Sequence, residues 1–333
     1  MVNSSMRQLL KIPTVFKLET SVTTIKEMHD YLEYFELIPG MKKFMANTDQ
    51  IIPSSGRLGF ELEMEGVPDL PKAPPLWEYH GDQSLRNHGT EMVSCPLPAE
   101  FIKPALYLLR QFLQKIAKKK PDFSWRTSNH IHCNVQDLSI QRFLFQLRLY
   151  LVFEPLLYFF AGQDRSISNF CVPLKDSTVD IPLSQMFQTE AFILRDLGKF
   201  WPKYAGLSIF RLGDYGTIEY RHLPGTGNIS RLIMWSNLIL SLYNAAESLD
   251  IKETDAEILK LNSTSTYEKF FGLIFKDIIP WDRKYESFIE QGVVFTKHCL
   301  AKNMEQQTFS IPKLKKIIDD QKKEKKSDPE III

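Results

Sequence analysis

The chain has 333 residues, of which 44% are hydrophobic and 24% charged, which is typical of a globular protein. Lysine and arginine number 41 against 40 acidic residues, so the net charge of +1 predicts no specific nucleic-acid partner. The four cysteines are scattered and form no C-x-x-C pair, which argues against a cysteine zinc site and a disulfide framework. A reducing compartment, the cytoplasm, is therefore expected.

The sequence also argues against a membrane partner. Its first residues contain no basic start followed by a long apolar run, so no secretory signal is expected. The most apolar segment, 143–162, carries Arg148 and Glu154 near its middle, and Pro155 follows them. Because the bilayer core disfavours such charges, we interpret this segment as part of a buried helix.

Residues 1–50 are predicted to form an N-terminal extension, in which 23–35 has helical spacing and Pro39-Gly40 marks a turn. The first clear strand is 56–66, where apolar and polar side chains alternate. Its two faces are made of Leu58, Phe60, Leu62 and Met64 on one side and of Gly59, Glu61, Glu63 and Glu65 on the other. The period of two thus predicts one apolar and one acidic face.

The elements that follow alternate between strands and helices. In chain order we expect strands at 77–80 and 90–95, a helix at 100–118, a strand at 124–135, a helix at 138–161, a hairpin of 207–212 and 216–223 around Gly213-Asp214, and an apolar helix at 232–246 preceded by Asn228 as N-cap. This order predicts an α+β fold with a mainly antiparallel sheet flanked by helices and a helical C-terminal part.

The domain organisation is predicted to be a main domain at 51–250, on which a helical part at 251–312 packs. Residues 313–333 then form a charged tail, since 313–326 holds seven lysines and three acidic residues. A solvated tail or terminal helix is the simpler interpretation of this run, and a weak anionic contact is the alternative.

Four short segments carry candidate chemistry, and two of them are the strands with the acidic residues and the histidines. Glu61, Glu63 and Glu65 lie roughly 6.5–7 Å apart along one strand face, which is either a plain polar face or, inside a cavity, a place where cations must separate the carboxylates. His130 and His132 also share a strand face, as surface hydrogen-bonding groups or as metal ligands and proton carriers. Magnesium suits such a site because it prefers oxygen ligands and often bridges carboxylates to phosphates.

A second set of polar residues lies further along the chain. Glu219 and Arg221 share a strand face and are either a simple ion pair or a carboxylate that holds a metal beside an arginine that holds a phosphate. Glu91 follows the turn that contains Asp82 and Ser84, and alone this segment is only a polar hairpin.

In their order and chemical type these pieces resemble the amidoligase family of ATP-dependent carboxylate–amine ligases, found in bacteria, fungi and phages. The matching motifs are Gly59-x-Glu61-x-Glu63, Asp82-x-Ser84-Leu85, Gly89-x-Glu91-x-Val93-Ser94-x-Pro96-Leu97, His130-x-His132 and Glu219-x-Arg221. The resemblance covers about 56–237 and implies a curved sheet like that of glutamine synthetase. It leaves the N-terminal extension and the last hundred residues outside.

The resemblance also implies roles for the matched residues. ATP and Mg²⁺ (or Mn²⁺) are the implied cofactors. The implied metal ligands are Glu63 and Glu91 at a first site and Glu61, His130 and Glu219 at a second. Arg221 would stabilise the transferred phosphate and act as the catalytic residue, while His132, Asp82 and Ser84 would contact substrate. The sequence lacks the full glycine-rich phosphate and glutamate loops of glutamine synthetase, which leaves the amino-acid substrate open.

Three further basic residues are candidates without a motif. Arg165 is placed after the long helix to bind a substrate carboxylate, with an ion pair to Asp164 or Glu154 as the alternative. Lys203 and Arg211, before and within the predicted hairpin, are candidates for phosphate contacts.

The expected function is thus an ATP-dependent ligase that joins a small-molecule or peptide carboxylate to an amine through an acyl phosphate. The alternatives are a non-enzymatic structural or binding protein that retains the fold, for example a phage component, and another enzyme of the same fold such as a guanidino kinase. Oligomer or virion partners fit the first alternative, and a phage-encoded protein would work in the host cytoplasm.

Overall fold

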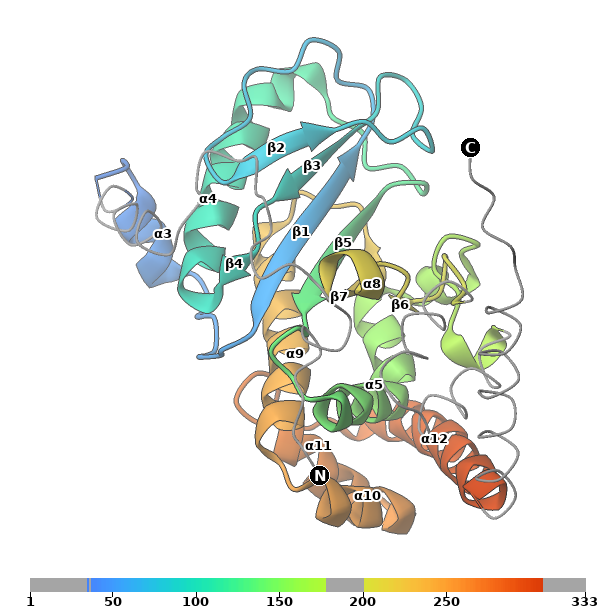
Figure 1. The fold of residues 1–333 in the computed structure, drawn as a ribbon. Coiled ribbons are helices and arrows are strands. Elements are labelled where there is room, and N and C mark those ends of the chain that lie inside the picture. Colours follow the sequence, from blue (N-terminus) through green and yellow to red (C-terminus); the bar gives the residue numbers. More distant parts are fainter. Residues whose placement is uncertain (1–34, 36, 178–200, 308–333) are drawn as a thin grey trace, which may run out of the picture.

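The computed structural model of the protein describes Phe35, residues 37–177 and residues 201–307. The predicted helix at 23–35, apart from Phe35, and the charged tail at 313–333 lie outside these residues. The described chain has the predicted α+β architecture, with one antiparallel sheet flanked by helices and a helical C-terminal part (Figure 1).

The sheet has seven strands, all paired in antiparallel fashion. They are β1 (Arg57–Met64), β2 (Trp77–His80), β3 (Thr90–Ser94), β4 (Leu97–Pro98), β5 (Ser128–Asn134), β6 (Leu207–Ser208) and β7 (Thr217–Pro224). Their order is β2-β3-β1-β5-β7-β6, and β4 pairs with the start of β1. The strands with the polar motifs are therefore neighbours: β3, β1, β5 and β7.

The register of these four strands aligns their polar residues. Glu63 lies opposite Glu91, Glu61 opposite His130, and His132 opposite Glu219. Directly opposed residues of antiparallel strands project from the same face. One face of the sheet therefore carries the acidic and histidine side chains of all four strands.

Helices supply the rest of the described fold. The α-helices are α3 (Met41–Asn47), α4 (Ala99–Ile116), α5 (Ile140–Ala161), α8 (Leu212–Tyr215), α9 (Ile229–Ser248), α10 (Ile251–Lys260), α11 (Thr264–Phe275) and α12 (Glu286–Gln307). Short 3₁₀ turns are η1 (Ala117–Lys119), η2 (Gln163–Ile167), η3 (Leu174–Asp176) and η4 (Arg283–Tyr285). Figure 1 shows α4 and α9 behind the sheet and α12 along α5.

The apolar face of the sheet lies against these helices. Leu58, Phe60, Leu62 and Met64 of β1 are all buried, as the alternation in the sequence predicted. Burial of one such side chain contributes about 1.5–3 kcal/mol. The same buried core continues through α5 and α9 to Cys299 in α12, so the C-terminal helices pack on it.

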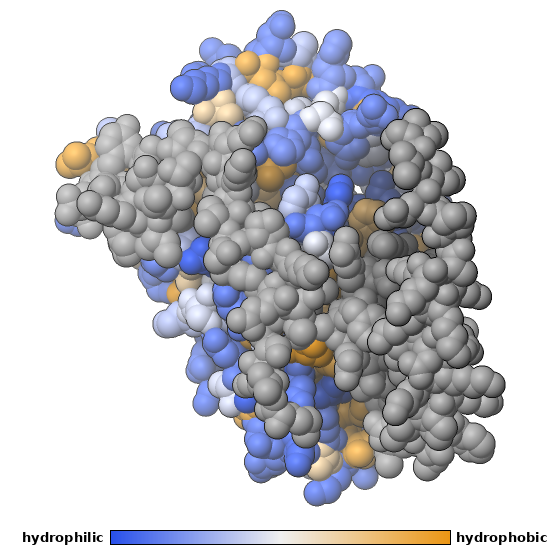
Figure 2. Space-filling model, in the orientation of Figure 1, coloured by the Kyte–Doolittle hydropathy of each residue, from blue (hydrophilic) through white to orange (hydrophobic). Residues whose placement is uncertain are grey.

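The long apolar segment forms α5, a core helix. It is long and apolar enough to span a bilayer, but neighbouring elements bury most of its side chains. Ser139 caps its start by accepting a hydrogen bond from the backbone of Arg142. Among the described residues visible in Figure 2, hydrophobic side chains form small separate groups. The burial of α5 confirms the interpretation of the apolar segment as a buried helix.

Two predicted elements differ in detail. The expected hairpin does pair, but β6 has only two residues and Gly213-Asp214 belong to the short helix α8. Gly216 ends α8 with a left-handed backbone (φ 67°), which glycine adopts without strain. The strand predicted from 124 begins at Ser128, because Ser124 to Thr127 form a turn closed by the Thr127 N–H donating to the Ser124 carbonyl.

A candidate metal and phosphate site

The polar face of the sheet is the floor of a cavity of about 630 Å³, a size that suits a small-molecule ligand. All but one of the predicted site residues line it: Glu61, Glu63, Asp82, Ser84, Glu91, His130, His132, Lys203, Arg211, Glu219 and Arg221. They come from four strands and from the loops that connect them. Residues up to 160 positions apart in the chain thus meet in one place.

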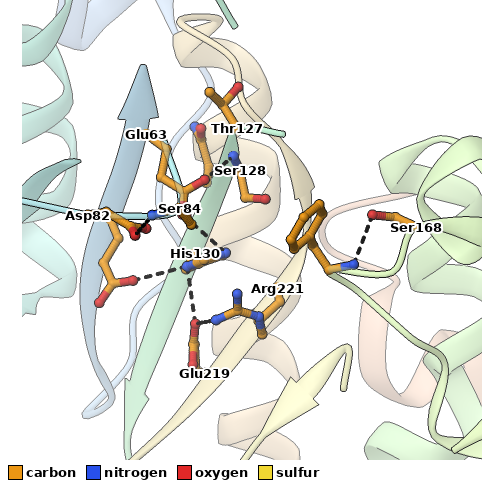
Figure 3. Close-up of polar contacts among 12 residues, drawn as sticks. Glu63, Asp82, Ser84, Thr127, Ser128, His130, Ser168, Glu219 and Arg221 are labelled. Carbon is orange, nitrogen blue, oxygen red and sulfur yellow. Dashed lines mark hydrogen bonds and ion pairs between the residues drawn. The ribbon is translucent and has the colours of Figure 1, made fainter. Parts of the chain in front are cut away.

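His130 is the centre of one group. Its Nδ1 lies 3.0 Å from Glu61 Oε2 and 3.1 Å from Glu219 Oε1, so two carboxylates share one ring nitrogen. In Figure 3 Glu219 lies between His130 and Arg221, and the Arg221 guanidinium donates to the same carboxylate oxygen. Glu61, His130 and Glu219 thus lie together, and these are the three residues that the resemblance implied as ligands of the second metal site.

His132 extends this group. Its Nε2 lies 2.9 Å from Glu61 Oε1, and its Nδ1 lies 3.1 Å from the Thr217 hydroxyl. One ligand atom each from Glu61, His132 and Glu219 lie within 4.8 Å of one another. His132 was expected to contact substrate, and the structure also places it among the residues able to hold an ion.

A second group lies toward the other end of β1. Ligand atoms of Glu63, Glu91 and Asp82 are within 4.8 Å of one another. The backbone N–H of Ser128 donates to Glu63 Oε2 over 2.6 Å, and that of Ser84 donates to Asp82 Oδ1 over 2.7 Å, which orients both carboxylates (Figure 3). Asp82 was expected to contact substrate, and the structure also places it with Glu63 and Glu91 among the residues able to hold an ion. Sequence reasoning missed this because Asp82 lies in a loop.

The carboxylates of this cavity have strongly perturbed acidities. Burial, together with the neighbouring charges of Glu61 and Glu63, raises the pKa of Glu91 to about 9. Burial also raises the pKa of Glu63. For Glu61 burial acts in the same direction, but His132 and His130 outweigh it and lower the pKa well below the usual range. The clustered acids Glu63 and Glu91 therefore resist ionisation in the metal-free protein.

The residues fit a divalent metal ion. His130 Nε2 and Arg221 Nε are buried and have no hydrogen-bond partner among the described residues, so the site holds polar atoms without protein partners. The donors are mainly carboxylate oxygens with imidazole nitrogen, a set suited to Mg²⁺ or Mn²⁺. Glu61 and Glu91 each belong to two of the three overlapping ligand groups, which suits more than one ion.

The structure corrects the predicted role of Arg165 as a substrate-binding residue. It is buried and does not line the cavity. Its guanidinium donates to the His222 and Arg221 carbonyls and to the Ser128 hydroxyl, each over 2.9 Å. Arg165 therefore braces β5 against β7 rather than contacting a substrate carboxylate, because the backbone takes up its donors.

The other two basic candidates lie at the rim of the cavity. Lys203 is exposed, and its ammonium lies 5.4 Å from the centre of the Tyr204 ring. Arg211 is also exposed and lies 3.6 Å from Asp214 in α8. Both positions remain compatible with a phosphate contact.

Sequence reasoning missed a group at one end of the cavity. Arg126, Phe170 and Tyr204 line it, but none of them belongs to a motif. The adjacent Trp125-Arg126, shortly before the histidine strand, was the one available signal, since tryptophan and arginine are both enriched at binding interfaces.

Comparison of the sequence with models of known protein families and with curated proteins gave no match. The functional argument therefore depends on the geometry of the cavity and on the order of the motifs that form it.

Proposed function

We propose that the protein is an ATP-dependent carboxylate–amine ligase that forms an amide or peptide bond. The observation that carries the proposal is the convergence of Glu61, Glu63, Glu91, His130 and Glu219 beside Arg221 on one cavity floor. A structural protein gains no stability from this arrangement, because burying several like charges together is unfavourable.

The reaction requires activation of the acid. A carboxylate does not react with an amine at neutral pH because its oxygen is a poor leaving group. Transfer of the γ-phosphoryl group of ATP to the carboxylate releases ADP and forms an acyl phosphate. The amine then attacks the acyl carbon, and inorganic phosphate leaves as the amide forms. Both steps balance without a protein nucleophile, and the buried cysteines have no role.

Each residue has a role that follows from its position. Glu63, Glu91 and Asp82 would hold one ion, and Glu61, His130 and Glu219 with His132 would hold another. Such ions neutralise phosphate charge and orient the transferred group. The Arg221 guanidinium, fixed by Glu219, supplies a cation beside them for the charge that develops on the phosphoryl oxygens. Lys203 and Arg211 add positive charge at the mouth of the cavity.

The proposal includes the setting of the reaction. The substrates are a small-molecule or peptide carboxylate and an amine. The four cysteines are free and buried, so the protein needs no disulfide, and we place it in the cytoplasm.

The decisive experiment measures ADP and phosphate release by the purified protein with ATP and Mg²⁺, using pools of amino acids, dicarboxylic acids and amines. A ligase releases ADP only when an acid and an amine are both present, and EDTA stops the release. ADP formation with a guanidino compound and no acid would indicate a kinase instead. No release with any pool would favour the structural alternative and defeat the proposal.

A further inference from the structure

One end of the cavity combines a cation with aromatic rings. The Arg126 guanidinium carbon lies 5.4 Å from the centre of the Trp125 ring and 5.5 Å from that of Phe170. The rings of Trp125 and Phe170 are 6.0 Å apart, and those of Phe170 and Tyr204 are 5.8 Å apart. Phe170 and Tyr204 line the cavity, and Trp125 lies beside them. Because Trp125 is 72% exposed and Tyr204 40%, the three rings form an open aromatic surface beside the cavity.

Arg126 has no compensating acid in the part of the chain that the structure describes. Its Nη2 donates to the Ser84 carbonyl over 2.8 Å, and its Nε is buried without a hydrogen-bond partner. Arg221, the other arginine at this end, is paired with Glu219. The two rings offset part of the hydration that burial removes from the guanidinium, but they supply no hydrogen-bond acceptor for its buried Nε. Arg126 is therefore placed to bind an anionic ligand.

The surroundings indicate which anion. The proposed phosphate position is the floor, where the ligand groups and Arg221 lie. The aromatic surface begins beside it, since the Arg221 guanidinium carbon is 5.9 Å from the centre of the Tyr204 ring. A triphosphate is strongly hydrated and gains little from three rings. An organic acid with an apolar body satisfies both features, since its carboxylate matches the planar guanidinium and its body packs on the rings.

We propose that Arg126 binds a carboxylate of the acid substrate and that Trp125, Phe170 and Tyr204 bind its apolar or aromatic part. The statement that the bound acid is a substrate rests on the proposed ligase function, but binding of the acid can be tested without catalysis. It assigns to Arg126 the role that the sequence had suggested for Arg165. It also narrows the substrate class to acids that carry an apolar or aromatic group.

The test uses 4-fluorophenylacetate as the probe and ¹⁹F NMR to measure its binding, with no nucleotide present. Wild-type protein should bind it, and Arg126→Met should weaken binding at least tenfold, because methionine keeps the apolar stem and removes the cation. The neutral 4-fluorophenylacetamide should bind weakly and equally to both proteins. Arg110→Met is the matched control, since Arg110 also lies over an aromatic ring, that of Phe44, but does not line this cavity, and it should change binding less than twofold.

Two further measurements separate the alternatives. Inorganic triphosphate with Mg²⁺ should bind wild type and Arg126→Met equally; a parallel loss would mean that Arg126 holds phosphate and would overturn the assignment. Arg126→Lys, which keeps the charge but not the planar fork, should bind the acid with intermediate affinity and serves if the methionine variant does not fold. Unchanged acid binding in both variants overturns the inference. Absence of ADP formation, by contrast, would defeat only the proposed function.

Discussion

Strand β7 carries two different polar systems on its two faces. Toward the cavity, Glu219 and Arg221 join several carboxylates that share few donors. Toward the core, His222 lies among α5 side chains, where Tyr150 donates to Glu154 Oε1 over 2.7 Å and lies 3.0 Å from His222 Nε2.

The buried system is matched within the protein. Glu154 also accepts a 2.8 Å hydrogen bond from the Leu174 backbone, and burial raises its pKa to about 7. Burial lowers the pKa of His222 to about 3, so its ring is neutral and its Nε2–H can donate to the Tyr150 oxygen. The Glu154 and Tyr150 oxygens thus each face a donor, and among the described residues His222 Nδ1 is the acceptor of this group that has none. On the cavity face, by contrast, Glu63 lies opposite Glu91 and close to Asp82, and bound cations would relieve the repulsion among these three carboxylates. The difference separates polar residues that stabilise the fold from those available for chemistry.

The largest effect is expected for activity, when a group of the cavity face is changed without altering its size. Glu63→Gln and Arg221→Lys should each lower amine-dependent ADP formation by about 10²–10³-fold, by analogy with the loss of one stabilising group at an oxyanion site. The matched control is Glu65→Gln. Glu65 follows directly after β1 and does not line the cavity, and its Oε1 accepts a hydrogen bond from the Arg86 backbone N–H. It should retain activity. Full activity in both cavity variants would refute the assignment of this site.

The second effect concerns nucleotide affinity. Without a divalent ion the clustered carboxylates repel the phosphates, so ATP should bind at least tenfold more weakly in EDTA than with Mg²⁺ or Mn²⁺. Isothermal titration calorimetry in the two buffers measures the difference. Equal affinities would mean that ATP does not bind through metal ions, and the contrast between the two faces of β7 would lose its functional meaning.

The third effect concerns the buried face. Tyr150→Phe removes a donor from buried Glu154 and should lower the free energy of unfolding by about 1–3 kcal/mol, the cost of an unsatisfied buried polar group. Urea denaturation followed by circular dichroism provides the value. Tyr79→Phe is a matched control, since its hydroxyl donates only to the Pro71 carbonyl in a half-buried place, and the loss should be smaller. Equal losses would show that the Glu154 network adds no particular stability.

The smallest effect is a gain in stability. Folded metal-free protein keeps the Glu91 proton up to a pH of about 9, whereas the unfolded chain releases it near the ordinary value of 4.5. The folded state then binds more protons, so this residue makes stability fall as pH rises between these values. Glu91→Gln should remove that fall and stabilise the metal-free protein at pH 7.5 by about 1 kcal/mol, a value reduced for water in the open cavity.

Thermal unfolding in EDTA at pH 5 and pH 7.5 tests this last effect. The variant should unfold at a higher temperature than wild type at pH 7.5 but not at pH 5. Saturating Mg²⁺ should make wild type the more stable protein, because wild type alone has the full set of metal ligands. A variant less stable than wild type at pH 7.5 in EDTA would show that the raised pKa of Glu91 does not lower the stability of the metal-free fold.

Much of the fold was predictable because the periodicity is strong. The alternation from Leu58 to Met64 predicted β1 and its buried face, and the apolar run of α5 predicted a core helix. The hairpin was harder to predict, since Gly213-Asp214 fit a tight turn as well as the one-turn helix α8 that they form. Local propensity does not distinguish the two, and packing of buried Leu212 decides.

The sequence by itself determined the chemical inventory of the site: which acids, histidines and arginines lie on the polar side of each strand. Side-chain direction alternates along a strand whatever its neighbours are, so this information is local. Only the tertiary structure decided which residues meet. Strand order places Glu61 between Glu91 and His130, and a loop places Asp82 beside Glu63. Arg165 donates to two backbone carbonyls and does not reach the cavity. Arg126 donates to the Ser84 carbonyl and pairs with no acid in the described part of the chain. Such contacts depend on chain segments far apart in sequence, which no local pattern encodes.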